Sequence, residues 1–188
     1  AIPETMVILG FAVAAMILMA GSTNLLMIFL SLEFLSIISY ILTGYLREDK
    51  KSNEASIKYF LFGAIATAIM LYGMSLFYGA TASLNLGEIG AVITADTNYE
   101  VLALFATALI LAGVGFKIAM VPFHMWAPDA YEGAPTPVTA FLSVGPKVAG
   151  FAILIRIVLQ VIIVYRVDWV ALFAITSVLT MTVGNVIA

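Results

Sequence analysis

The chain has 188 residues, of which 63% are hydrophobic and 10% are charged, and its mean hydropathy is +1.13. Soluble domains carry about 25% charged residues, and a water-soluble globule of this length has too much surface to hide such an apolar excess, so a soluble fold is excluded. The formal net charge of −3 provides no basic surface for nucleic acid, and nucleic-acid binding is excluded as well.

Six long apolar runs predict six membrane-spanning segments. A bilayer core about 30 Å thick requires about 20 residues of helix, and continuous rather than alternating apolar runs favour helices over a β-barrel. We expect the fold class to be all-α, a polytopic membrane bundle that forms a single transmembrane domain over residues 1–188. In chain order, the spans are expected at about residues 5–20, 24–46, 56–79, 101–133, 136–159 and 168–187.

Both ends of the sequence suggest a piece of a longer protein. The first residues, AIPETMVILG, contain no initiator Met and no basic segment before the apolar run, so they do not resemble a signal peptide. The last residues, GNVIA, end inside an apolar stretch. We therefore expect an internal start and further helices beyond the end.

Two loops determine the expected orientation in the membrane. Basic residues are retained on the cytoplasmic side, and the loop after the second span contains four of them: Arg47, Lys50, Lys51 and Lys58. The segment from Gly79 to Glu100 is expected to be a loop that contains acidic residues and no Lys or Arg. We place the first loop in the cytoplasm and the second on the opposite side.

The fourth span is expected to be a discontinuous helix. The segment VPFHMWAPDAYEG has two prolines, no Lys or Arg, and enough apolar residues to continue through the membrane. Pro122 lacks a backbone donor and clashes with the preceding turn, so it should interrupt the helix there. A single broken span over residues 101–133 puts Lys117 near its middle. Asp129 and Glu132 are then expected to be solvated loop charges near the inner face.

Three charges are expected at one depth in the bilayer. Glu33 lies near the centre of the second span, Lys147 near the centre of the fifth, and Lys117 near the break. Each costs about 2.5–3.5 kcal/mol at the centre of a spanning helix, so a compensating role is expected. We interpret Glu33 and Lys117 as an ion pair that switches proton affinity when it forms or breaks, and Lys147 as the next proton acceptor. The alternative is a static pair that locks helix packing.

Polar side chains accompany these charges on the same helix faces. Ser36, Tyr40 and Thr43 follow Glu33 at helical spacing, and Thr139 and Ser143 precede Lys147 at intervals of four. Such hydroxyls can hold the waters that a proton path requires.

His124 follows the predicted break and has two interpretations. Its ordinary pKa lies near neutrality, which suits a proton relay, but its side chain could instead cap carbonyls freed by the break. Trp126 and Trp169 are expected to be anchors at the membrane interface.

No cofactor or metal is expected in this chain. The absence of Cys excludes thiolate-bound iron–sulfur clusters, a Cys-based zinc site and disulfides. A single His cannot supply the two axial ligands of a bis-histidine haem.

Three long blocks resemble a known family: LSLEFLSIISYILTGY, SNEASIKYFLFGAIATAIMLYGMSLFYGATASL and GVGFKIAMVPFHMWAPDAYEGAPTPVTAFLSVGPK. They are similar to the antiporter-like membrane subunits of NADH-quinone oxidoreductase, respiratory complex I, and within that family to subunit N. The resemblance implies a fold of about fourteen helices, of which this chain corresponds to about the fourth to the ninth, including the broken helix.

The resemblance also assigns roles to individual residues. Glu33 matches the family's membrane glutamate, Lys117 the lysine of the broken helix, and Lys147 the lysine that links the input and output halves of a proton path. His124 falls on the segment after the break, where members of the family often but not uniformly carry His.

The function implied is that of a non-redox, proton-translocating subunit of a bacterial inner-membrane complex. NADH, FMN, iron–sulfur clusters and quinone are then expected in other subunits, and the expected partners are the other membrane-arm subunits, the lipid bilayer, protons and internal water. A subunit of a multi-subunit cation/proton antiporter is the alternative, and a structural spacer in the membrane arm is a third possibility.

Overall fold

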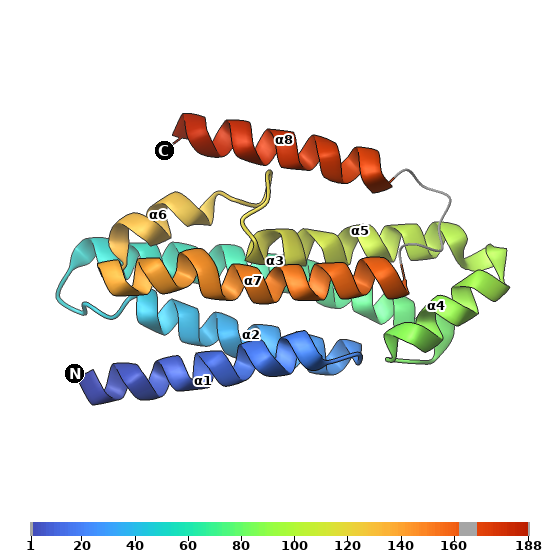
Figure 1. The fold of residues 1–188 in the computed structure, drawn as a ribbon, viewed down its shortest axis with the longest axis horizontal. Helices are drawn as coiled ribbons and strands as arrows, with labels where there is room; N and C mark the ends of the chain where they lie inside the picture. Colours follow the sequence, from blue (N-terminus) through green and yellow to red (C-terminus); the bar gives the residue numbers. More distant parts are fainter. Residues whose placement is uncertain (1, 162–168, 188) are drawn as a thin grey trace.

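The computed structural model describes residues 2–161 and 169–187, and the regular structure of these residues is helical (Figure 1). The elements are α1 (Ile2–Gly21), α2 (Leu25–Thr43), α3 (Lys50–Thr81), α4 (Leu86–Ala95), η1 (Thr97–Tyr99), α5 (Glu100–Lys117), α6 (Trp126–Gly133), α7 (Thr136–Gln160) and α8 (Trp169–Ile187). Six of them, α1, α2, α3, α5, α7 and α8, are long and apolar enough to cross a membrane. The predicted fold class, an all-α polytopic membrane protein, is confirmed. The expected start of the last span at residue 168 lies outside the described residues.

The long helices lie side by side in one bundle (Figure 1). α1 packs on α2, α3 packs along α5 and α6, and α7 contacts α1, α2 and α5. α8 lies along the outside of the bundle, next to the α5–α6 connection, and none of its described residues is buried. Because α5, the connection and α6 follow one another along the length of α3, they occupy the place of a single interrupted helix.

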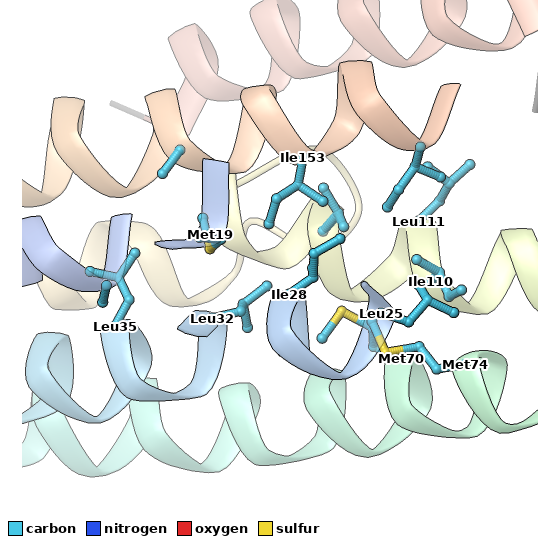
Figure 2. Packing of buried hydrophobic residues seen from close by; sticks show 14 of the residues in the cluster. Met19, Leu25, Ile28, Leu32, Leu35, Met70, Met74, Ile110, Leu111 and Ile153 are labelled. Atoms are coloured by element: carbon cyan, nitrogen blue, oxygen red, sulfur yellow. The ribbon is translucent and has the colours of Figure 1, made fainter. Parts of the chain in front are cut away.

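The core lies where α2, α3, α5 and α7 meet. Figure 2 shows Leu25 and Ile28 of α2 close to Met70 of α3, Ile110 of α5 and Ile153 of α7. All five side chains are at most 1% exposed. In lipid there is little hydrophobic drive between helices, so this contact is stabilised by dispersion between closely fitted side chains.

Two equivalent turns are joined at one end of the bundle. Each contains the pattern Ser-x-Asn-Leu, and the Asn side-chain oxygen, Asn24 before α2 and Asn85 before α4, accepts hydrogen bonds from two N–H groups of the first helical turn. Two backbone hydrogen bonds join the turns. Leu25 donates its N–H to the Leu84 carbonyl at 2.8 Å, and Leu86 donates its N–H to the Thr23 carbonyl at 2.9 Å. The paired turns thus satisfy backbone groups that a helix start leaves free.

The interpretation of residues 79–100 as a loop is wrong. α3 continues to Thr81, and α4 then packs its apolar side chains Leu86, Ile89 and Ile93 into the core. Gly90 on the same face lies so close to the Gln160 carbonyl of α7 that a Cβ would collide with it. The acidic residue Glu88 lies in the first turn of α4, where the helix dipole favours a negative charge.

Glycines allow α3 and α5 to approach closely. A Cβ at Gly113 of α5 would lie 2.5 Å from the Cβ of Met70, and a Cβ at Gly73 of α3 would lie 2.7 Å from the Ala106 carbonyl oxygen. Small residues at helix contacts are a general device of membrane bundles.

Gly73→Ala should therefore destabilise the protein by about 1–3 kcal/mol, because the methyl group meets α5 backbone that cannot move aside. Gly79→Ala on the same helix is the matched control, since nothing lies within 4 Å of a Cβ there. Thermal denaturation of the full-length protein in its assembled complex measures both variants. Equal midpoints for the two would contradict the packing described here.

Candidate functional site: a broken helix around a buried lysine

The break in the helix begins at Lys117, ahead of the proline that was expected to cause it. α5 ends at Lys117, and Ala119 takes a left-handed conformation with φ of 58°. The backbone N–H of Met120 then bonds the Gly115 carbonyl at 2.8 Å, which closes the end of the helix. The prediction of a discontinuous helix is confirmed, but the interruption starts before Pro122.

Trp126 closes the break from the other side. Its indole N–H donates to the Phe116 carbonyl at 2.9 Å, and its ring stacks on Tyr59 of α3 with the centroids 4.1 Å apart and the planes 6° apart. Trp126 is 2% exposed. The expectation of an interfacial anchor is therefore wrong for Trp126, which instead satisfies a carbonyl that the break releases.

Ion pairs hold α6 against the beginning of α3. Lys51 lies 2.7 Å from Glu132, and Lys58 lies 3.3 Å from Asp129. Asp129 and Glu132 were expected to be solvated loop charges, but they lie on a helix and pair with α3, although both stay partly exposed. Exposed pairs contribute only about 0–1 kcal/mol each, so these two chiefly fix the register of α6.

The Lys117 side chain, at the end of α5, is buried between α2 and α7. It is 1% exposed, and its ammonium donates to the Ser36 hydroxyl of α2 at 3.0 Å. On the α7 side, a Cβ at Gly150 would lie 3.7 Å from the Lys117 side chain. The same Cβ would lie 2.6 Å from Ile118 Cγ2, so the glycine at this position makes room for Ile118, next to the lysine.

Glu33 lies on α2 one turn before Ser36 and is half-buried. Its carboxylate accepts a hydrogen bond from the Thr67 hydroxyl of α3 at 2.7 Å. It lies close enough to Lys117 for a Coulombic interaction, but within the described residues no nitrogen–oxygen contact within 4.0 Å joins the two side chains. The expected direct ion pair is not formed here; Ser36 contacts Lys117 in its place.

Lys147 and His124 line one cleft of about 480 Å³, together with Tyr131 and with Thr180 of α8. The Lys147 ammonium lies 5.3 Å from the centroid of the Tyr131 ring. Both ring nitrogens of His124 are buried and have no hydrogen-bond partner among residues 2–161 and 169–187. His124 therefore caps no carbonyl in this structure, and the broken helix and α7 bring it to the same cleft as Lys147.

The sequence matches a known family over most of its length. Residues 22–188 match the family model described as NADH:quinone oxidoreductase/Mrp antiporter, TM. The chain belongs to this family. Its curated relatives include NAD(P)H-quinone oxidoreductase subunit 2 of Prochlorococcus marinus (strain NATL2A), 50% identical over 188 residues, and NADH-quinone oxidoreductase subunit N of Trichlorobacter lovleyi, 49% identical over 179 residues.

The chain spans 36% and 37% of the length of these two relatives, which cover 100% and 95% of it. Among solved structures, a chain of respiratory complex I from Thermus thermophilus with bound aureothin is 42% identical with a TM-score of 0.73, over 81% of this chain and 34% of that one. A chain of the Mrp complex from Dietzia sp. DQ12-45-1b is 28% identical with a TM-score of 0.69, over 79% and 28%. The helical bundle of this family member is thus part of a larger family fold.

Two polar contacts in this family member were not predicted from the sequence. Thr67 supplies the hydrogen bond to Glu33, and its only signal was a hydroxyl in the middle of an apolar run. Arg156 of α7 donates to the Ala20 carbonyl of α1 at 2.8 Å, where a cation suits the negative end of a helix. The sequence feature that could have indicated this contact is that Arg156 is a further charged residue within the fifth apolar run.

Trp126→Phe should loosen α6, because phenylalanine keeps a ring against Tyr59 but cannot donate to the Phe116 carbonyl. A lost buried hydrogen bond of this kind costs about 1 kcal/mol. Hydrogen exchange of the assembled protein should show faster exchange at α6 with unchanged exchange at α2. Trp126→Ala should have a larger effect, since it also removes the stacked ring; identical exchange in all three proteins would contradict the assigned role.

Proposed function

We propose that this chain forms the proton-translocating part of a membrane subunit of NADH-quinone oxidoreductase, respiratory complex I. The observation that carries the proposal is the ammonium of Lys117, buried at a helix break and bonded to a neutral hydroxyl beside Glu33. The printed names of the curated relatives, NADH-quinone oxidoreductase subunit N and NAD(P)H-quinone oxidoreductase subunit 2, support it.

The arrangement around Lys117 suits a group that changes its charge. A lysine that serves only as a lock would be expected in direct contact with a carboxylate, whereas Lys117 contacts a serine and Glu33 contacts a threonine. Because the two charges lie near each other in a low-dielectric interior, the protonation of either alters the proton affinity of the other. Glu33 and Lys117 then form the first, coupled step of a proton path.

Lys147 and His124 form the next step. Gly150, which packs on Lys117, lies one helical turn from Lys147, so α7 connects the buried lysine to the cleft. His124 lines that cleft with both ring nitrogens unpartnered in the described structure, so it is available to accept and release a proton. We assign it as a relay between Lys147 and internal water.

The subunit acts as a translocase without a redox group of its own. NADH, FMN, iron–sulfur clusters and quinone bind to other subunits, and quinone reduction there supplies the energy for proton movement here. The partners are the other membrane-arm subunits, and the setting is the bacterial inner membrane, which the chain crosses several times. The six apolar helices support the membrane setting.

The alternative function is that of a subunit of a multi-subunit cation/proton antiporter. It is favoured by the likeness to a chain of the Mrp complex, at 28% identity, whereas curated oxidoreductase subunits are up to 51% identical. Purification of the native complex separates the two functions: flavin and iron–sulfur proteins that copurify with the chain would support the oxidoreductase, and their absence the antiporter.

Lys117→Ala in the complete complex should abolish proton pumping linked to NADH oxidation, because it removes the amine that accepts the proton in the first step of the proposed path. The control is Lys50→Ala, which removes an exposed lysine at the start of α3. Proton uptake by inverted membrane vesicles during NADH oxidation measures both variants. Unchanged pumping after neutralisation of Glu33, Lys117 and Lys147 would leave the chain as a structural spacer.

Ser36→Ala should reduce pumping about tenfold, because a buried hydrogen bond to a charged group contributes about 1.5–3 kcal/mol. Ser31→Ala is the matched control: Ser31 is also buried on α2, but its hydroxyl bonds only carbonyls of its own helix among the described contacts. Both variants are compared in the same vesicles after normalisation to the amount of assembled complex. Equal losses for the two serines would show that Ser36 acts only through helix packing.

A further inference from the structure

Tyr131 lies between the two parts of the site, in the last turn of α6. One face of its ring points toward Lys147, whose ammonium lies 5.3 Å from the ring centroid. On another side the ring meets Trp126 edge-on, with the centroids 6.0 Å apart and the planes at 75°. The tyrosine thus connects the tryptophan that closes the break to the lysine of α7.

The position of this ring is fixed independently of Lys147. The Thr139 hydroxyl donates to the Tyr131 carbonyl at 3.1 Å, and Trp126 is itself held by Tyr59 and by the Phe116 carbonyl. The Tyr131 hydroxyl is buried and has no hydrogen-bond partner in the described part of the chain. The contact with Lys147 therefore involves the ring face, not the hydroxyl.

Within the described ranges, Lys147 has no carboxylate partner in an ion pair. Among the described residues no acidic oxygen lies within 4.0 Å of its ammonium, and the cleft that it lines also contains His124. An aromatic ring attracts an ammonium through the negative potential of its face. The attraction is weaker than that of a carboxylate at the same depth, so it orients the charge without fixing the proton.

We propose that Tyr131 is a positioning residue, whose ring holds the Lys147 ammonium on the side of the cleft that contains His124. The inference rests on the proposed function, because it assumes that Lys147 carries protons. It adds an uncharged residue to the proton path. Tyr131 does not itself take up or release the proton, but its ring sets the position of the Lys147 ammonium.

The test compares aromatic and aliphatic side chains at position 131 in the complete complex. Tyr131→Phe should retain pumping, because the ring face remains, whereas Tyr131→Leu should lower NADH-driven pumping about fivefold, in line with the strength of cation–π contacts. Tyr72→Leu, an exposed tyrosine on α3, is the control for the loss of a membrane tyrosine. Rates are normalised to the amount of assembled complex.

A second series separates ring electrostatics from packing. Phenylalanine analogues with one, two and three fluorine atoms, incorporated at position 131, keep the ring in place while the negative potential of its face decreases. Pumping should fall stepwise with fluorine number. A purely structural role predicts equal pumping along the series.

Lys147→Ala is measured alongside, so that the two proposals can fail separately. If Lys147→Ala leaves pumping intact, the proposed function of that lysine is wrong. If Lys147→Ala abolishes pumping while Tyr131→Leu and the fluorinated series match Tyr131→Phe, the proton path stands and the inference about Tyr131 is overturned.

Discussion

The structure depends on one constraint, which is that a lysine ammonium must be kept inside a membrane bundle. Lys117 meets this constraint at the last residue of α5, where the negative end of the helix dipole favours a cation. Ending the helix there releases backbone carbonyls, which are costly to leave unbonded in lipid. Trp126 and the tight backbone bonds of residues 118–120 satisfy part of that need. The buried charge and the broken helix therefore explain each other.

Close helix contacts follow from the same constraint. α7 approaches the break through Gly150, where a Cβ would lie 2.6 Å from Cγ2 of Ile118, the residue after Lys117. Gly73 and Gly113 bring α3 against α5 in the same manner. α6, on the other side of the connection, is tied to α3 by the ion pairs of Lys51 and Lys58.

Hydropathy predicted the fold class and the choice of charged residues, because both depend on the cost of polar groups in lipid. It did not find α4, whose ten residues are too few to span a membrane and whose burial depends on contact with α7. Nor could it place Trp126, because an aromatic residue between two prolines, at positions 122 and 128, fits an interface as well as a stack on Tyr59. The contact between Glu33 and Lys117 was predicted as direct because sequence position gives depth but not helix rotation. In the orientation that α2 takes about its axis, the Ser36 hydroxyl accepts a hydrogen bond from Lys117, and the Glu33 carboxylate accepts one from Thr67.

A row of aromatic rings connects the two halves of the site through α3 and α6. Tyr40 meets Tyr59 edge-on at 4.7 Å, Tyr59 stacks on Trp126, and Trp126 meets Tyr131, over which the Lys147 ammonium lies. Tyr40 belongs to the same helix as Glu33 and Ser36, so the row begins beside one charged group and ends under another. Aromatic rings in edge and stacked contact resist displacement because their geometry is specific. The rings thus form one continuous set of contacts from α2 through α3 and α6 to the Lys147 ammonium, so the two sides of the candidate site share a single packed wall.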